Sequence, residues 1–365
     1  MPIVRISNIL SDGSVGSDFA YYGEQNSDDM YALYDGAVVL AMSGATTGKI
    51  SVLHTKKGQK YYQNQRVGYF TPTDSCDYGF IKTIMRSQLF AEQLSSVLVA
   101  GAQPNVSSRE IDGFEFMIPK SKDEQQKIGV YFSKLDHLIT LHQRKCDETK
   151  RLKKYMLQKM FPQNGGKVPE IRFSGFTDDW EQRKLEDIAE FSKGSGYSKG
   201  DLIESGTPII LYGRLYTKYE TSISEVDTYV EAKDGSVYSK GGEVIVPASG
   251  ETAEDIARAA TVDKSGVILG GDLNVVSPNE DINSAFLAIS ISHGNSQREL
   301  AKKAQGKSVV HIHNEEIKNL VVPFPANAEQ NKIVEYFSNL DHLITLHQRK
   351  SCWLAYGSHF RLGTA

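Results

Sequence analysis

Histidine and aspartate recur in a fixed order at two places in the sequence, where they could bind a metal ion or act as a general base. The first set is Asp136, His137 and His142, and the second is Asp341, His342 and His347. Five residues separate the two histidines of a set. On a helix this corresponds to a rotation of about 140°, so the two rings do not share a face. We therefore expect polar residues in a helix–helix seam or on a partner surface, and no metal site.

Two glycine-containing segments resemble ligand-binding loops only in part. A phosphate-binding loop has four residues between its glycines and a Ser or Thr after its lysine. Here only three residues separate Gly44 from Gly48, and Lys49 is followed by Ile50. Residues 190–196 have glycines at the wrong spacing for the cofactor loop of an adenine methyltransferase, and the sequence contains no Asn-Pro-Pro-Tyr motif. We expect turns at both places, no cofactor and no catalytic activity. A further pair, His311 and His313, could share one strand face but has no third ligand.

Basic and amide side chains gather in two stretches of a slightly acidic chain, whose formal net charge is −4. Such side chains bind bases and phosphates of DNA, and a local basic patch is compatible with an acidic whole. We expect each stretch to contact DNA as a group, while a solvated surface role is the alternative for any single residue. The first stretch comprises Lys49, Lys56, Lys57, Lys60, Gln63, Asn64, Gln65 and Arg66. The second comprises Lys193, Lys199, Tyr212, Arg214 and Lys218.

One long segment occurs twice. Residues 124–145 read EQQKIGVYFSKLDHLITLHQRK and residues 329–350 read EQNKIVEYFSNLDHLITLHQRK, so that only four positions differ. Upstream the match continues at an offset of 206 residues, at which Gly36 aligns with Gly242. An offset of this size indicates the duplication of a whole domain with its helix, because solenoid repeats are far shorter.

Each domain copy is predicted to combine strands and helix. Short Val/Ile-rich strands lie between Gly and Ser residues, and one helical segment follows, from about Tyr78 to Leu98 and from about Asn283 to Lys303. This composition predicts the α+β class. An alternating apolar pattern that ends at proline predicts a final strand in each copy. Its residues are Ile111, Phe114, Phe116, Ile118 and Pro119 in the first copy, and Ile317, Leu320, Val322, Phe324 and Pro325 in the second.

Apolar residues repeat every seven positions along the duplicated segment, which predicts two long helices. The first should run from about Lys122 to Met160, because Pro162 and two glycines then end it. The apolar stripe of each helix is the nearest available partner for the stripe of the other, so we expect the two helices to pair as an antiparallel coiled coil. The residues expected to pair are Ile128, Phe132, Leu135, Ile139, Ile333, Phe337, Leu340 and Ile344.

These boundaries predict five segments and a soluble protein. We expect a first domain at residues 1–121, a first helix at 122–162, a second domain at 163–327, a second helix at 328–356 and an irregular tail at 357–365. The three cysteines are widely spaced, which favours neither a disulfide framework nor a zinc site. The sequence has no membrane span and no signal peptide, so we expect a cytoplasmic location.

Two motifs carry a resemblance to a known family. The run E-Q-x-K-I-x-x-Y-F-S-x-L-D occurs at Glu124 and again at Glu329. The opening of the second domain contains Pro169, Ile171, Arg172, Phe173, Gly175, Phe176, Trp180, Glu181 and Leu185. In order, spacing and duplication, these features resemble the specificity subunits of type I restriction-modification enzymes.

The resemblance implies a non-catalytic subunit that binds double-stranded DNA. Each domain would be a target recognition domain that reads one half of a bipartite target. The helices would set the half-site spacing and dock two modification (methyltransferase) subunits, and restriction/translocase subunits would join through the complex. A helix from Lys122 to Met160 would span about 58 Å, or about 17 base pairs as an upper bound on the half-site separation.

Three alternatives stay open. Residues 169–207 have no counterpart in the first domain and residues 351–365 match nothing in the repeat, which favours a silent or truncated copy of such a subunit. A late start codon with a frameshift or rearrangement would explain it, and sequencing the flanking gene would test this. A stand-alone methyltransferase or nuclease predicts activity of the isolated chain. A coiled-coil adaptor predicts no preference for any duplex.

Overall fold

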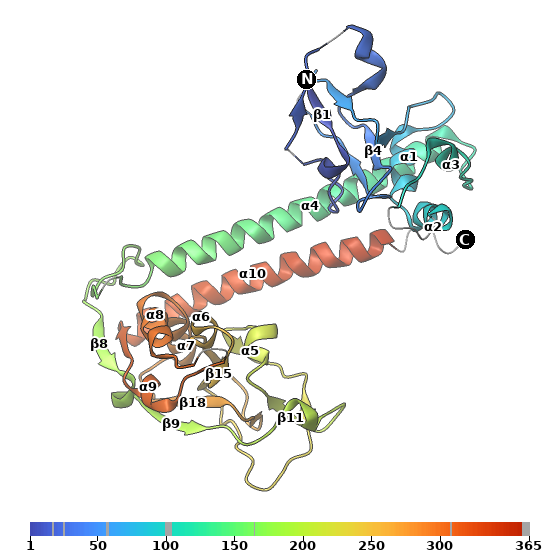
Figure 1. The fold of residues 1–365 in the computed structure, drawn as a ribbon. Coiled ribbons are helices and arrows are strands. Elements are labelled where there is room, and N and C mark those ends of the chain that lie inside the picture. The colour runs from blue at the N-terminus through green and yellow to red at the C-terminus, as the bar shows by residue number, and fades with distance from the viewer. Residues whose placement is uncertain are drawn as a thin grey trace. The chain divides into compact units, whose positions relative to one another are not determined.

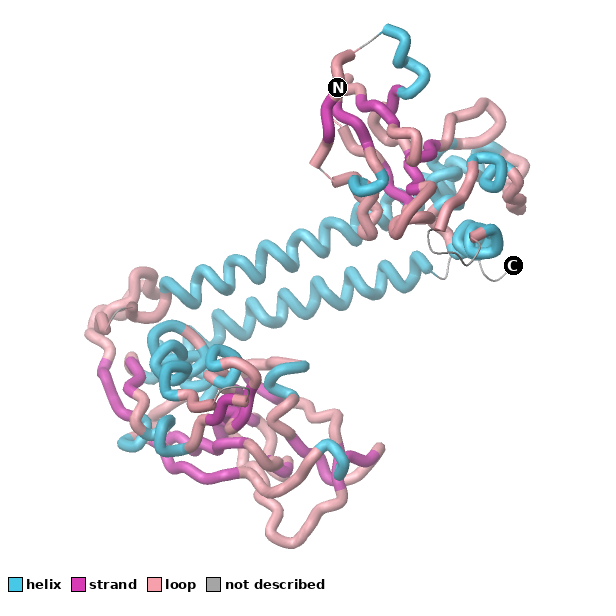
Figure 2. Tube along the Cα trace, in the orientation of Figure 1, coloured by secondary structure: helices cyan, strands magenta, loops and turns pink. Residues whose placement is uncertain are grey.

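The computed structural model describes residues 1–365 apart from 17, 25, 56–57, 99–103, 164, 307–308 and 360–365. Its contacts divide the chain into two units: unit 1 contains Met1–Lys145 and Leu346–Ala365, and unit 2 contains Cys146–Thr345. Each of the two long helices therefore contributes a segment to both units (Figures 1 and 2). Among the described residues, no helix has the length and apolar character needed to cross a membrane.

Unit 1 is built around a central strand, β4, whose four residues are all buried. Alternate residues of a strand point to opposite faces, so Val38 and Leu40 pack against helices α1 and α2, while Val39 and Ala41 face the other sheet. The sheets have the orders β2-β1-β6-β3 and β5-β4-β7. The strands are β1 Pro2–Val4, β2 Ala20–Tyr21, β3 Ala32–Leu33, β4 Val38–Ala41, β5 Ile50–Val52, β6 Tyr61–Gln63 and β7 Val67–Tyr69. The helices are α1 Tyr78–Met85, α2 Gln88–Val97, α3 Ser108–Asp112 and the long α4 Lys122–Lys159.

Unit 2 has the same plan around β14, which is buried throughout. Val244 and Val246 pack against the buried helix α7, and Ile245 faces a second core. The larger sheets have the orders β12-β16-β14-β18-β9 and β10-β13-β11-β17, and two-stranded pairs β15-β19 and β20-β8 complete the unit. The strands are β8 Glu181–Lys184, β9 Ala189–Lys193, β10 Leu202–Ile203, β11 Thr207–Ile210, β12 Ser222–Ile223, β13 Tyr229–Val230, β14 Glu243–Pro247, β15 Ser249–Gly250, β16 Ala260–Val262, β17 Ile268–Leu269, β18 Leu273–Pro278, β19 Val310–His311 and β20 Val321–Phe324. The helices are α5 Arg214–Thr217, α6 Ala253–Ile256, α7 Ser284–Ser292, α8 Gly294–Lys303, α9 Asn314–Lys318 and the long α10 Asn327–His359.

The two units share one strand framework in the same register. Val39 pairs with Tyr69 in unit 1, and Ile245 pairs with Val275 in unit 2, each 206 residues further along. The parallel pairs β1–β6 and β11–β17 correspond in the same way. The expected α+β class with two repeated domains is thus confirmed.

The single helical segment expected in each domain is wrong, because each unit has two helices there. In unit 1, α1 ends at Met85 and α2 begins at Gln88. Ser87 between them has extended backbone, and its hydroxyl accepts a hydrogen bond from the N–H of Phe90, so that it caps a new helix. In unit 2, His293 adopts extended backbone between α7 and α8.

The final strand expected in each domain is correct only in part. Ile111 and Ile317 lie in the short helices α3 and α9. In unit 2 the rest of the pattern forms β20, which pairs with β8. Residues 114–119 form no strand, because the described part of unit 1 has no equivalent of β8 for them to pair with.

The two long helices pack antiparallel, as the apolar stripes predict. In unit 2 the ammonium group of Lys153 on α4 donates to both carboxylate oxygens of Asp341 on α10, at 2.6 and 2.8 Å. In unit 1 the Nδ1 atoms of His142 and His347 lie 3.0 Å apart. Residue numbers therefore rise along α4 as they fall along α10. The first helix ends at Lys159, one residue before the expected end.

Candidate nucleic-acid interface

The carboxyl end of β4 brings together candidate DNA-binding residues that are far apart in the sequence of unit 1. The N–H of Ala41 donates to the C=O of Lys49 at 2.9 Å, on the side of β5. On the side of β7, the N–H of Met42 donates to the C=O of Arg66 at 3.0 Å. The half-buried Lys49 and the exposed Arg66 therefore flank one strand end.

In the turn between β6 and β7, two polar side chains bond to the backbone and two others are exposed. The amide of Gln63 donates to the C=O of Val67 at 2.5 Å, and the side-chain oxygen of Asn64 accepts from the N–H of Arg66 at 3.2 Å. These two side chains shape the turn. Gln65 and Arg66 are exposed, so their side chains are the ones that the turn offers to a ligand.

Lys60 lies at the opposite end of β6 and is paired with acidic neighbours. Its ammonium group donates to the carboxylate of Asp29 and lies 3.7 Å from Oε1 of Glu24. The hydrogen bond to Asp29 raises the pKa of Lys60. Its charge is therefore already balanced within unit 1. Lys56 and Lys57 lie outside the described residues.

The corresponding strand end in unit 2 has the opposite chemistry. The N–H of Ala248, which follows β14, donates to the C=O of Asp272 at 2.7 Å, so that Asp272 occupies the position of Arg66. Asp272 has a φ of 57°, a left-handed conformation that aspartate tolerates better than most residues. The hydroxyl of Ser249 donates to its carboxylate at 3.3 Å and lies 3.3 Å from Nδ1 of His311. The pattern of basic residues in the sequence missed this group, although the repeat offset of 206 pointed to it.

Three of the five candidates in unit 2 have exposed side chains: Lys193, Lys199 and Tyr212. Lys193 ends β9 opposite Asn274 of β18, so it lies at the same sheet end as Asp272. Lys199 begins a short 3-10 turn, and Tyr212 precedes α5. The structure therefore brings one of the three to the strand end and leaves the other two on neighbouring loops.

Arg214 is buried instead of being presented to a ligand. Its guanidinium donates to Asp227 at 2.6 Å, to Glu220 at 2.8 Å and to the C=O of Glu225 at 2.8 Å, and the side chain is 8% exposed. Lys218 donates to the other oxygen of Asp227 at 2.8 Å. The hydrogen bonds from Lys218 and Arg214 lower the pKa of Asp227 to about 2. A DNA contact by Arg214 would require this network to open.

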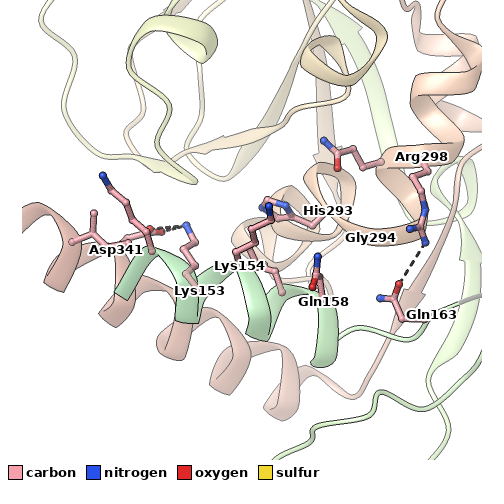
Figure 3. A pocket seen from close by; sticks show the side chains of 12 residues that line it. Lys153, Lys154, Gln158, Gln163, His293, Gly294, Arg298 and Asp341 are labelled. Carbon is pink, nitrogen blue, oxygen red and sulfur yellow. Dashed lines mark hydrogen bonds and ion pairs between the residues drawn. The ribbon is translucent and has the colours of Figure 1, made fainter. Parts of the chain in front are cut away.

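A basic groove of about 670 Å³ lies between α4, α8 and α10 in unit 2 (Figure 3). Burial lowers the pKa of His293, at one side of the groove, to about 4, so its ring is neutral at pH 7. None of the DNA-binding candidates lines it. Its polar lining consists of Lys150, Lys153, Lys154, Gln158, Gln163, His293, Gln297, Arg298 and Asp341.

One histidine of each recurring set lies in the helix seam. His142 and His347 share a hydrogen bond in which one ring must donate and the other accept. Desolvation, with His142 and two lysines nearby, lowers the pKa of His347. His137 and His342 are exposed. The described residues contain no group of three or more His, Cys, Asp or Glu side chains able to hold a metal ion.

The residues expected to pair in the seam differ in burial between the units. Ile333, Phe337 and Leu340 are buried in the main core of unit 2, together with Leu157 of α4. Ile128 packs half-buried against a core of unit 1. The others are half-buried along the helices: Phe132, Leu135, Ile139 and Ile344.

The fold and these surfaces define a class of protein: two copies of one α+β domain that carry different polar surfaces on the same framework, with a pair of long helices. The family model of the type I restriction modification DNA specificity domain matches residues 1–151 and again residues 177–352. The chain therefore belongs to the family of type I restriction modification DNA specificity domains.

Individual relatives are distant in sequence. The chain is similar to the specificity subunit of the type I restriction enzyme MjaVIII of Methanocaldococcus jannaschii, with 20% identity over 259 residues, 68% of this chain. The match spans 60% of the length of that relative. The crystal structure of a type I restriction-modification S subunit from M. genitalium has a TM-score of 0.62 and 12% identity, and the match covers 96% of this chain and 88% of that one. A chain from a study of complex assembly and conformational transition of the type I R-M system has a TM-score of 0.54 and 15% identity, with coverage of 98% and 89%. These structures share the fold.

Proposed function

We propose that this protein is the DNA specificity subunit of a type I restriction-modification complex. In this role it binds double-stranded DNA in the cytoplasm and carries out no catalysis itself. Membership of the family and the two matched domain copies support the proposal. We propose target recognition domains at residues 1–121 and 163–327, connecting segments at 122–162 and 328–356 that contain α4 and most of α10, and a tail at 357–365 whose first three residues continue α10.

One observation supports the proposal of a bipartite target: equivalent positions on the shared framework of the two units have opposite charge. Arg66 in unit 1 corresponds to Asp272 in unit 2. A guanidinium can donate to guanine or bind phosphate, whereas a carboxylate accepts from the amino group of cytosine and repels phosphate. Surfaces that differ in this way suit two different half-sites.

The candidate DNA contacts of each domain are the side chains that are exposed at the strand ends and on the nearby loops. We propose that Lys49, Gln65 and Arg66 contact one half-site. For the other half-site we propose Lys193, Lys199 and Tyr212. The remaining candidates, Lys60, Gln63, Asn64, Arg214 and Lys218, have protein partners that argue for a supporting role.

The exposed faces of the helices support docking of two copies of one partner. Leu138 and its repeat equivalent Leu343 are 40% and 41% exposed. Helix pairing does not require identity at exposed positions, yet this leucine recurs. We propose that modification (methyltransferase) subunits dock there, and that restriction subunits join through the complex.

Helix length limits the separation of the half-sites. The 38 residues of α4 correspond to about 57 Å at 1.5 Å per residue. At 3.4 Å per base pair this is about 17 base-pair steps, an upper bound on the separation.

The test is co-expression with a cognate modification subunit, followed by genome-wide mapping of methylated adenines. We expect methylation at a split motif with a fixed gap. Soluble protein with an active partner but no such motif would contradict the proposal. Methylation by the isolated chain would instead indicate a catalytic protein.

A further inference from the structure

The duplicated helix motif contains a glutamine that is buried in both units. Gln125 and Gln330 are each 2% exposed, although both lie in the first turn of a long helix. The neighbouring Glu124 and Gln126 are exposed. A buried amide is stable only when its donors and acceptors have partners, so the contacts of these two side chains indicate what they do.

In unit 1 the side chain of Gln125 joins three parts of the domain. Its oxygen accepts from the N–H of Asp77 at 2.9 Å, and its amide nitrogen donates to the C=O of Pro119 at 2.8 Å. Asp77 in turn caps α1 by accepting from the N–H of Phe80, whose ring lies in the core. One amide thus ties the start of α4 to α1 and to the segment that leads into α4.

Unit 2 repeats the same arrangement with different surrounding residues. The oxygen of Gln330 accepts from the N–H of Asn283 at 2.9 Å, and its nitrogen donates to the C=O of Pro325 at 3.0 Å. Asn283 caps α7 by accepting from the N–H of the buried Phe286. The contact is therefore a shared feature of the two units, and we call it the glutamine latch.

Each unit reinforces its latch in its own way. In unit 1, α4 and α1 approach so closely that a Cβ on Gly129 would lie 2.6 Å from the carbonyl carbon of Gly79. In unit 2, Arg172 forms two hydrogen bonds of 2.8 Å with the buried carboxylate of Glu329. Since the reinforcement differs and the latch does not, the latch is the common means of fixing the helix to its domain.

We propose that Gln125 and Gln330 are positioning residues that fix the direction in which each long helix leaves its domain, and thereby determine how strictly the gap between half-sites is read. This inference rests on the function proposed above. A helix of about 57 Å amplifies small errors at its root, because a swing of about 5° moves the far end by about 5 Å, more than one base-pair step of about 3.4 Å.

The test uses the full chain in complex with its modification subunits. Binding is measured to duplexes that keep both half-sites and change the gap by one base pair in either direction. Gln125→Asn and Gln330→Asn shorten the amide so that it no longer reaches both partners, and Gln126→Asn at the exposed neighbouring position is the matched control. We expect discrimination between the correct and the altered gap to fall about tenfold, or about 1.4 kcal/mol, in the two latch variants alone. The base preference within each half-site should stay the same.

The outcomes separate this inference from the proposed function. A wild-type complex without any gap preference would overturn the proposed function. A wild-type preference that both latch variants retain would overturn the latch. Equal weakening at every gap would indicate a purely structural role and would also overturn it. If the variants do not fold, hydrogen exchange of the wild-type protein decides, because the amides of Asp77 and Asn283 must be protected like helix interiors, and exchange at loop rates would contradict the latch.

Discussion

His293 lies where α7 ends and α8 begins, and burial lowers the pKa of its ring to about 4. The charges of Lys153 and Arg258 add to this shift, because they disfavour a protonated ring. In the unfolded chain the ring takes up its proton near pH 6.5. Between about pH 6.5 and pH 4 the unfolded state therefore binds the additional proton. The free energy of unfolding of unit 2 should fall as the pH falls through this window, by up to about 3 kcal/mol from this group.

Substitution of this histidine should flatten the pH dependence. We expect His293→Gln to lose most of the decline in stability between pH 6.5 and pH 4, whatever its stability at pH 7. Urea unfolding at several pH values measures how the free energy of unfolding changes with pH. His137→Gln removes an exposed histidine, and its free energy of unfolding should change with pH as that of the wild type does. Equal slopes for all three proteins would argue against the assignment.

The internal repeat supplies a matched control for the buried ion pair of unit 2. Glu329 is buried and bonded to Arg172, whereas Glu124 at the same position of the first motif is exposed. Glu329→Gln removes the buried carboxylate that binds the largely buried guanidinium of Arg172, which should lower the free energy of unfolding by about 3 kcal/mol. Glu124→Gln should change it by less than about 0.5 kcal/mol. Denaturant unfolding measures both, and similar effects would show that the ion pair contributes little.

At the scale of elements, α10 presents one leucine to the core and another to solvent three residues later. Leu340 is 6% exposed and packs in the core of unit 2, and Leu343 is 41% exposed. Leu340→Ala should leave a cavity and lower the free energy of unfolding by about 2–4 kcal/mol. Leu343→Ala should cost less than about 1 kcal/mol. Thermal or urea unfolding of the two variants checks this. A larger loss of stability in Leu343→Ala than in Leu340→Ala would mean that the buried face of α10 has been assigned incorrectly.

The same exposed face should matter for assembly more than for folding. Leu138→Asp and Leu343→Asp place a charge where we propose that modification subunits dock. We expect each variant to unfold like the wild type but to bind modification subunits at least about tenfold more weakly, because an apolar contact is replaced by a desolvated charge. Co-purification and titration of the purified subunits measure this. Unchanged affinity of both variants would exclude this face.

The helices and the domain repeat could be predicted from sequence because their signals are local. Seven-residue apolar spacing and near-identity of two segments need no tertiary information. The break between α1 and α2 could not be predicted in this way, since it depends on Ser87 leaving the helical conformation to cap α2. The burial of Arg214 depends on three acceptors that only the folded loop brings together. Likewise, β20 is a strand because β8 is there to pair with it.

At the scale of the whole molecule, a substitution that weakens DNA recognition by one domain should leave recognition by the other domain unchanged. Arg66→Ala should relax base preference in one half of the split motif and leave the other half intact. Removal of one cation that contacts DNA also reduces the salt dependence of binding, by about one unit of the log–log slope if the contact is to phosphate. Lys60→Ala is the control, because its charge is already paired with Asp29. Methylation mapping and binding titrations at several salt concentrations measure both. Loss of preference in both halves would contradict independent reading.

His142 meets His347, which is its own equivalent in the second copy of the motif. A hydrogen bond between two identical rings needs one donor and one acceptor, so a single proton breaks the equivalence of the two helices at this point. For two neutral rings, an exchange of these roles requires both rings to change tautomer, because transfer of the bridging proton alone would leave an imidazolate beside an imidazolium. This contact therefore distinguishes the two helices only through the tautomers of its two rings. An orientation along the DNA, with one half-site first and the other second, would need asymmetric groups elsewhere in the protein, such as the different polar surfaces of the two domains.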